Sequence, residues 1–272
     1  MNYSVLMSVY YKENPDYLRQ SMESIYNQTV KTNDFVLICD GPLSEELDKV
    51  IGEMQSKFGN VLNVIRLEKN GGLGNALRIG VEKCKNEYIA RMDSDDISKP
   101  VRCEKQLKVF ENNSEISIVG SNIDEFSETP NKIESSRCVP ENNEDILKFA
   151  KKRNPFNHPS VMYKKEAVLQ AGNYKDVRFM QDYFLWVDML SSGYKGYNIQ
   201  EPLVNMRADA NLFKRRSGKE YFKIQKSLFK YMREKKMINY FEYVISITIR
   251  FCSSFSNNKI REKVFKTFLR KK

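Results

Sequence analysis

Residues 35–42 read Phe35-Val36-Leu37-Ile38-Cys39-Asp40-Gly41-Pro42, an apolar run that ends in a polar turn. Such a run predicts a short strand that is buried on both faces. On either side the apolar residues have helical spacing, over 16–27 and 44–58, and Ser44 suits the N-cap of the second helix. Further out, the pattern predicts strands at 3–9, 62–67, 88–92 and 116–120 and helices at 72–84, from about residue 102, and at 144–152, 165–171 and 182–190.

Strands and helices that alternate at this short period predict an α/β fold with a mainly parallel sheet flanked by helices. Ligands of such sheets bind outside the carboxyl ends of the strands, so functional residues are expected directly after strands. Four polar segments stand in that position: Tyr10-Tyr11-Lys12-Glu13, Asp40, Lys69-Asn70-Gly71-Gly72 and Asp93-Ser94-Asp95-Asp96.

The chain has 272 residues, of which 41% are hydrophobic, and this size favours one catalytic domain with an extension. Residues 1–9 carry no basic region of a secretory signal, and the most apolar window, 243–249, is far shorter than the ~20 residues that span a membrane. The five cysteines include no CxxC pair, which predicts reduced cytosolic thiols.

The net charge of +10 is concentrated at the end of the chain, because residues 220–272 hold 14 Lys/Arg and 4 Asp/Glu. Lysines alternate there with aromatic residues, as in Phe229-Lys230-Tyr231, which predicts basic amphipathic helices suited to an anionic membrane surface. The alternative is that these helices pack on the catalytic domain with a solvated lysine face. No nucleic-acid partner is expected, because the rest of the chain is neutral and lacks a nucleic-acid-binding motif.

The segment Arg91-Met92-Asp93-Ser94-Asp95-Asp96 places three carboxylates within four residues after a predicted strand. These carboxylates repel one another unless a cation or hydrogen-bond donors offset their charge. Magnesium-type ions use one or two carboxylates together with substrate phosphates, so the segment predicts a metal that bridges a diphosphate. The alternative is an acidic N-terminus of the helix that follows, where carboxylates are favoured.

The segment from Lys69 to Arg78 contains Gly71, Gly72 and Gly74. Glycines let the backbone approach a ligand closely, and a helix N-terminus attracts anions. The spacing is neither that of a P-loop nor that of a dinucleotide fingerprint. A tight turn between a strand and a helix is the alternative.

Together these segments resemble the family 2 glycosyltransferases with the GT-A (Rossmann-like) fold, especially bacterial enzymes that build surface polysaccharides such as O-antigen and capsule. The resemblance covers roughly residues 3–210. It rests on Val5-Leu6-Met7-Ser8-Val9-Tyr10, Cys39-Asp40-Gly41, Asn70-Gly71-Gly72-Leu73-Gly74 with Ala76, and Ala90-Arg91-Met92-Asp93-Ser94-Asp95-Asp96 followed by Pro100 and Arg102. Cys39 departs from the family pattern, because many relatives have an acidic residue at this position.

For the donor, the resemblance implies a UDP-sugar held by the residues around the carboxyl edge. Tyr10 and Glu13 would border the nucleoside, and Asp40 would hydrogen-bond the base. Asp93 would contact the ribose or the sugar, and Asp95, with Asp93, would hold Mg²⁺ or Mn²⁺. Asn70, Gly71 and Arg78 would also lie at the donor.

For the acceptor, the resemblance points to the segment 179–186, with Asp182 as catalytic base. An inverting transfer requires such a carboxylate to take the proton of the acceptor hydroxyl. Asp182 is also compatible with a helix-capping role, and Gln181 stands where relatives often carry an acid. His158 and Trp186 are placed on the acceptor side, with a purely structural role as the alternative for each.

Arg215 and Arg216, together with Arg207, follow the predicted catalytic region. Clustered arginines on a loop suit a bidentate clamp on the donor diphosphate, and a solvated basic run is the alternative.

These features predict a GT-A catalytic domain over 1–215, with a nucleotide-sugar-binding half (1–100) and an acceptor-binding half (101–215), and a basic helical extension over 216–272. The implied enzyme transfers a hexose or N-acetylhexosamine from a UDP-sugar to a lipid-linked (polyprenyl-diphosphate) or growing glycan. Its expected location is cytoplasmic and peripheral, on the inner face of the cell membrane. The alternatives are a metal-dependent nucleotidyltransferase, disfavoured because the first loop has no glycine, and a non-catalytic membrane-associated scaffold.

Overall fold

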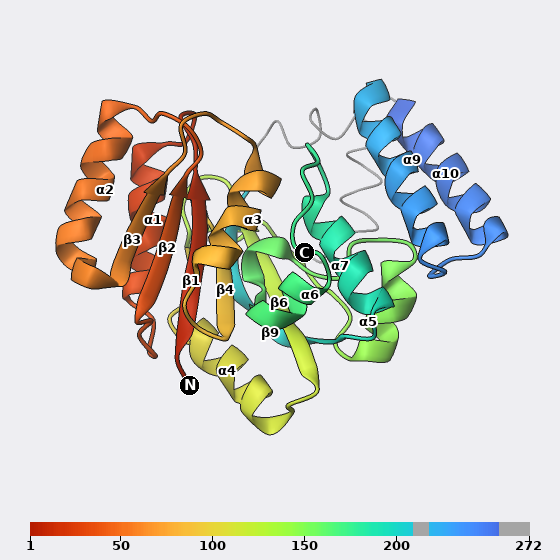
Figure 1. Cartoon of the computed structure of the whole chain (residues 1–272), viewed down its shortest axis with the longest axis horizontal. Coiled ribbons are helices and arrows are strands. Elements are labelled where there is room, and N and C mark those ends of the chain that lie inside the picture. Colours follow the sequence, from red (N-terminus) through yellow and green to blue (C-terminus); the bar gives the residue numbers. More distant parts are fainter. Residues whose placement is uncertain (209–217, 256–272) are drawn as a thin grey trace.

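The computed structural model describes residues 1–208 and 218–255. Within them, one nine-stranded sheet has the order β3-β2-β1-β4-β8-β6-β9-β5, with β7 paired to β6. Strands β1, β2, β3, β4, β6 and β9 run in one direction, and β5, β7 and β8 oppose them, so the predicted mainly parallel α/β sheet is confirmed (Figure 1). The strands are β1 Tyr3–Val9, β2 Asp34–Cys39, β3 Leu62–Arg66, β4 Tyr88–Asp93, β5 Ile97–Ser98, β6 Ile116–Phe126, β7 Ser135–Arg137, β8 Met162–Lys164 and β9 Lys195–Arg207.

Helices cover both faces of this sheet. Side chains of α1, α2 and α4 pack in one hydrophobic cluster, and those of α3, α5, α6 and α7 pack in a second cluster on the other face. The helices are α1 Pro15–Tyr26, α2 Glu45–Phe58, α3 Leu73–Lys83, α4 Arg102–Asn112, α5 Asn143–Ala150, α6 Lys165–Gln170, α7 Gln181–Ser191, α9 Gly218–Glu234 and α10 Tyr240–Phe255, with short 3₁₀ helices at Gly59–Val61 and His158–Ser160.

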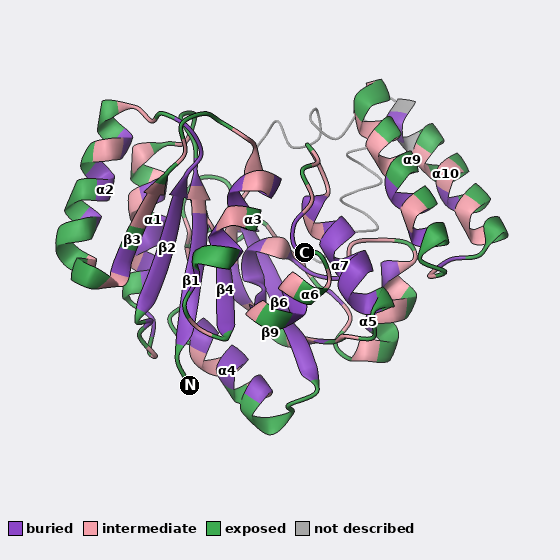
Figure 2. Cartoon of the chain, in the orientation of Figure 1, coloured by how far each residue is buried: buried purple, intermediate pink, exposed green. Residues whose placement is uncertain are grey.

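Strand β2 shows why its sequence is apolar throughout. Phe35, Leu37 and Cys39 belong to the first cluster, whereas Val36 and Ile38 belong to the second. Every residue of the strand is buried, as Figure 2 shows for the centre of the sheet. The helix predicted after it begins where expected, because the Ser44 side chain accepts a hydrogen bond from the Leu47 backbone N–H at 3.4 Å.

Strand β9 was absent from the sequence prediction, and β6 extends six residues beyond the predicted range of 116–120. The two strands pair in parallel, but their register shifts near Asn122, which pairs with Pro202. These irregularities disrupt the alternation in β9. Strand β6 is buried at every position although it contains Asn122, Asp124 and Glu125, so it shows no alternation either. The pair matters for the site because β9 ends at Arg207, at the carboxyl edge.

The C-terminal extension packs directly on α7. Leu228, Phe229 and Met232 of α9 form a third hydrophobic cluster with Phe184 and Val187 of α7. Beside it, the buried carboxylate of Asp188 lies 3.0 Å from the ammonium groups of both Lys175 and Lys235. Helix α9 is therefore part of the packing that supports α7. The predicted boundary at 215/216 and the final residues 256–272 lie outside the described residues.

Across the residues that the structure describes, none of the helices combines the length and the apolar character that crossing a bilayer requires.

Candidate active site

The carboxyl ends of the parallel strands meet at one edge and bring the predicted residues together. Asp93 ends β4, and Arg207 ends β9. The backbone N–H of Arg207 donates to Asp96 Oδ1 at 2.8 Å, and its guanidinium Nε donates to the Asp95 carbonyl oxygen at 3.2 Å. The last strand of the sheet thus holds the acidic segment that follows β4.

The buried guanidinium of Arg91 compensates the negative charge of Asp93, the first of the three carboxylates. It is fully buried, and its Nη1 and Nη2 atoms donate to the two oxygens of Asp93, the Nη1–Oδ2 distance being 2.7 Å. Such a bidentate, charge-assisted pair fixes the orientation of Asp93. A second buried arginine, Arg102, donates to the backbone carbonyl oxygen of Arg91 at 2.7 Å and so fixes the end of β4.

The carboxyl groups of Asp95 and Asp96 have less positive charge beside them than that of Asp93. Burial, followed by the charges of Asp93 and Glu13, raises the pKa of Asp95 to about 7. Burial and the two neighbouring aspartates also raise the pKa of Asp96 well above its ordinary value. The Oδ2 atom of Asp96 is buried and has no hydrogen-bond partner among the described residues. Glu13 lies here as well, because the Ser94 hydroxyl donates to its carboxylate.

These groups fit a hard cation. Clustered carboxylates with raised pKa values gain stabilisation from a nearby positive charge, and oxygen is the ligand that Mg²⁺ and Mn²⁺ prefer. Within residues 1–208 and 218–255, no three His, Cys, Asp or Glu side chains form a complete metal cage. That finding is compatible with an ion of the Mg²⁺ type, which is usually held by one or two carboxylates and completed by substrate phosphates and water.

The alternative interpretation of this acidic segment as a helix N-terminus is wrong. Asp96 is followed by strand β5, and the N-cap position of α4 is occupied by Val101. The carboxylates therefore do not cap a helix.

Asp40 holds the glycine-rich loop in place. Its Oδ1 atom accepts from the Gly71 backbone N–H at 2.7 Å and its Oδ2 atom from the Gly72 N–H at 2.9 Å, while the Asn70 amide donates to its carbonyl oxygen at 3.1 Å. Gly41 must be glycine, because its φ is +89° and an added Cβ would lie 2.6 Å from the Asn70 nitrogen. The structure thus gives Asp40, predicted to bind the base, a positioning role for Asn70, Gly71 and the start of α3.

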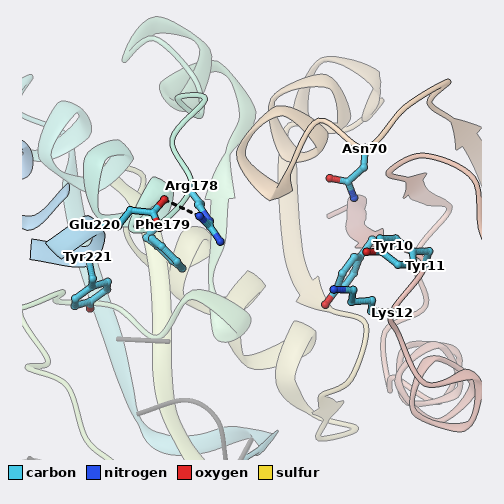
Figure 3. A pocket seen from close by; sticks show the side chains of 8 residues that line it. All are labelled: Tyr10, Tyr11, Lys12, Asn70, Arg178, Phe179, Glu220 and Tyr221. Atoms are coloured by element: carbon cyan, nitrogen blue, oxygen red, sulfur yellow. Dashed lines mark hydrogen bonds and ion pairs between the residues drawn. The ribbon is translucent and has the colours of Figure 1, made fainter. Parts of the chain in front are cut away.

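An open cleft of about 690 Å³ lies beside this loop. Figure 3 shows that its lining comes from two sets of residues on opposite sides: Tyr10, Tyr11, Lys12 and Asn70 on one, and Arg178, Phe179, Glu220 and Tyr221 on the other. Arg178 forms an ion pair with Glu220 at 2.6 Å. The cleft thus presents aromatic rings, the cation of Lys12 and the ion pair of Arg178 with Glu220. The rings and Lys12 suit an anionic ligand with a flat ring.

On the acceptor side, Asp182 lies in the first turn of α7, and Met180 occupies the N-cap position of that helix. The Asn154 amide donates to Asp182 Oδ2 at 2.5 Å, and burial raises the pKa of this carboxyl above its usual range. A carboxylate with a raised pKa binds a proton more readily, as a general base requires.

The two other residues predicted on the acceptor side, His158 and Trp186, make contacts with neighbouring aromatic residues. His158 Nε2 lies 3.0 Å from the Tyr174 hydroxyl, and burial followed by the charge of Arg91 lowers the pKa of His158 well below its usual value. The ring is therefore neutral at pH 7. Trp186 is fully buried in the second hydrophobic cluster, beside Phe156, so it supports the site from the core.

The arginines predicted at the donor lie in different places. Arg78 is exposed on α3, where it donates to Asn75 Oδ1 at 3.1 Å. Arg207 stacks on the Tyr17 ring at 3.6 Å and supports the acidic segment. Arg215 and Arg216 lie outside the described residues. Arg178, which lines the cleft, was not predicted from the sequence. Its position four residues before Asp182 could have indicated it.

Comparisons with known proteins agree with this geometry. Residues 4–175 match the family model described as Glycosyl transferase family 2. The chain is 37% identical over 250 residues to the amylovoran biosynthesis glycosyltransferase AmsE of Erwinia amylovora, covering 91% of this chain and 92% of that one. It is 34% identical over 269 residues to the Escherichia coli UDP-Gal:alpha-D-GlcNAc-diphosphoundecaprenol beta-1,3-galactosyltransferase, covering 99% and 97%.

Among solved structures, S. aureus TarS 1-349 in complex with UDP superposes with a TM-score of 0.64 at 12% identity, covering 98% of this chain and 70% of that chain. This similarity supports the fold alone. The fold is the GT-A fold, as the sequence resemblance implied. The chain belongs to glycosyl transferase family 2. Family membership favours a glycosyltransferase over the nucleotidyltransferase and scaffold alternatives.

The raised pKa of Asp95 predicts a specific dependence of stability on pH. The pKa of Asp95 is about 7 in the folded protein and about 4 in the unfolded chain. Its carboxyl group therefore lowers the free energy of unfolding by the full amount above pH 7 and has no effect below about pH 4. Asp95→Asn should therefore raise the free energy of unfolding by about 1–3 kcal/mol at pH 8, with a much smaller gain at pH 5. Urea denaturation in the presence of a chelator measures both values.

Asp176→Asn provides the control, because Asp176 is exposed on the loop before α7 and should change stability little at either pH. An equal gain for Asp95→Asn at pH 8 and pH 5 would show that its carboxyl is not under electrostatic strain.

Proposed function

We propose that this chain is an inverting, metal-dependent glycosyltransferase that moves a hexose or N-acetylhexosamine from a UDP-sugar to a hydroxyl of a lipid-linked or growing glycan in surface polysaccharide biosynthesis. The observation that carries this proposal is the acidic segment after β4, which lies at the same sheet edge as the glycine-rich loop held by Asp40. Similar proteins support it: the E. coli relative is a galactosyltransferase for UDP-galactose and a diphosphoundecaprenol-linked sugar, and TarS forms complexes with UDP and with UDP-GlcNAc.

In this proposal the donor occupies the cleft. The exposed ring of Tyr10 borders the nucleoside, and Asn70 and Gly71, held by Asp40, contact it from the glycine-rich loop. Lys12 and Arg178 supply positive charge near the phosphates. Arg215 and Arg216 remain predicted to clamp the diphosphate.

Asp95, with Asp93, would hold Mg²⁺ or Mn²⁺. The ion, when bound, would offset the negative charge of the departing diphosphate. Arg91 contributes by fixing Asp93 through both of its carboxylate oxygens. Glu13, hydrogen-bonded through Ser94, adds negative charge that favours a cation at this position.

Asp182 is proposed as the general base. The acceptor oxygen attacks the anomeric carbon of the sugar on the face opposite the diphosphate, the bond from that carbon to the phosphate oxygen breaks, and the hydroxyl proton passes to the Asp182 carboxylate. Asn154 orients this carboxylate through its hydrogen bond to Oδ2. Burial keeps its proton affinity above that of a solvated aspartate.

We also propose that the enzyme works on the cytoplasmic face of the cell membrane, as a peripheral protein attached through its basic extension. The lysines of the extension suit anionic lipids, and a diphosphoundecaprenol acceptor, like that named for the E. coli relative, would lie in the same membrane.

Calorimetric titration of UDP tests the donor site and its metal together. UDP should bind at least about tenfold more tightly with Mn²⁺ than with a chelator, because the ion and the phosphates complete each other's ligands. Asp95→Ala should remove this difference, whereas Asp176→Ala should keep it. Equal UDP affinity with and without Mn²⁺ in the unmodified protein would refute the metal-dependent donor site.

Removing the base should separate chemistry from binding. Asp182→Asn should lower the turnover of transfer by about 10²–10⁴-fold and leave UDP affinity within about twofold of the unmodified protein. In the unmodified enzyme, turnover should fall as the pH drops through the raised pKa of Asp182, because the protonated carboxyl accepts no proton. Asp176→Asn is the control, and undiminished turnover in Asp182→Asn would place the base on another residue.

A further inference from the structure

Helix α10 exposes an apolar surface on the side that faces away from α7 and α9. One continuous stripe along the helix consists of exposed, uncharged residues, here called the α10 stripe: Tyr240, Phe241, Val244, Ile245, Thr248, Ile249 and Cys252. Phe241 is 77% exposed, and Ile245 and Ile249 are each 59% exposed. The Thr248 hydroxyl donates to the Val244 carbonyl oxygen at 3.0 Å, so the helix itself provides its acceptor.

The opposite side of α10 carries the charge. Arg250 stacks on the Phe229 ring of α9 at 3.8 Å and donates to the Lys152 carbonyl oxygen. Glu242 forms an ion pair with Lys151 at 3.2 Å, and Ser246 is 8% exposed. Tyr243 and Ile247 also pack inward, against the third hydrophobic cluster, so α10 is apolar on its inner and its outer side. A helix on a water-exposed surface normally carries polar residues on its outer side. A contiguous apolar surface of this kind marks an interaction site.

The charge around the stripe indicates the partner. Lys223, Lys226 and Lys230 of α9 and Lys235 and Lys236 of the connecting turn are exposed, and the stripe itself contains no carboxylate. Over the described residues 220–255, there are seven Lys/Arg and three Asp/Glu. An apolar stripe with aromatic residues, flanked by lysines, fits the interface of an anionic bilayer, and α10 is too short to cross one.

The position of α10 connects the stripe to the cleft. Helices α9 and α10 lie side by side (Figure 1), and the ring of Phe222 near the start of α9 contacts that of Phe251 near the end of α10, with centroids 5.5 Å apart. Glu220 and Tyr221, which precede Phe222, line the cleft. The end of α10 that carries Ile249 and Cys252 is therefore the end nearer the cleft.

We propose that the α10 stripe inserts into the headgroup region of an anionic bilayer and so brings the cleft to the membrane surface. The lipid-linked nature of the acceptor rests on the proposed function, whereas the docking itself rests on the stripe and its flanking lysines. A lipid-linked acceptor would then reach the cleft without leaving the bilayer, while Lys12 and Arg178 stay available to the donor phosphates.

Flotation with phosphatidylglycerol–phosphatidylethanolamine vesicles at low salt tests the docking in the full chain. Point variants are required, because truncation would also remove the α9 side chains that pack on α7. Phe241→Ser/Ile245→Ser should lower the vesicle partition coefficient by at least about tenfold, since it removes two inserted apolar side chains. The matched control is Val101→Ser/Ile133→Ser, which alters two exposed apolar residues elsewhere and should bind as the unmodified protein does.

Fluorescence gives a second readout that does not depend on a loss of binding. Trp186, the only tryptophan, is buried and supplies a constant background. Phe241→Trp should show a blue shift on addition of the same vesicles, and Ile133→Trp should show none. Absence of a shift for Phe241→Trp would overturn the proposal.

Three further results would overturn it: no flotation of the unmodified protein, equal flotation of Phe241→Ser/Ile245→Ser, or a dimer in solution that this variant dissociates while vesicle binding persists. The last result would identify the α10 stripe as the contact between two copies. A measurement of UDP release from UDP-sugars without vesicles distinguishes a failure of membrane docking from a failure of the proposed glycosyltransferase function. Release should be equal in the variant and its control, and its absence from all proteins would count against the proposed function alone.

Discussion

Arg91 lies fully buried at the end of β4 and neutralises Asp93, and the rest of the site depends on this ion pair. Without it, none of the three aspartates that follow the buried strand would have a bidentate ion pair, since Arg102 and the Arg207 guanidinium donate to backbone carbonyl oxygens there. Arg91 compensates one of the three, so Asp95 and Asp96 keep raised pKa values and an unpartnered oxygen. The remaining negative charge is what leads us to propose a cation at this site.

The sheet positions every other component relative to this pair. Parallel strands bring Tyr10, Asp40 and Asp93 to one edge, and β9 returns to the same edge so that Arg207 holds the acidic segment. Asp40 commits its carboxylate to two backbone N–H groups, which fixes the loop before α3. On the other side, α7 carries Asp182 and is packed against α9, so the extension supports the acceptor side of the site.

The first half of the fold could be predicted because its strands are short, apolar and followed by polar turns, as Phe35–Cys39 illustrates. In the second half, the helices predicted at 144–152, 165–171 and 182–190 correspond to α5, α6 and α7. Strand β9 and the end of β6 could not be predicted, because β6 is buried at every position and the pairing of the two strands shifts register. The acidic segment and Asp182 were found from local sequence and family resemblance. Local sequence did not reveal that Asp40 holds the loop, that Arg178 lines the cleft or that an apolar side of α10 faces outward, since each depends on contacts between distant segments.

The central claim is that the carboxylates after β4 hold a divalent cation together with the diphosphate of the donor. Anomalous diffraction from crystals grown with Mn²⁺ and UDP tests this most directly. The account predicts one strong anomalous peak within bonding distance of the Asp95 carboxylate and of the UDP phosphates, with Asp93 still paired to Arg91. Ordered UDP with no manganese peak at these carboxylates would contradict it.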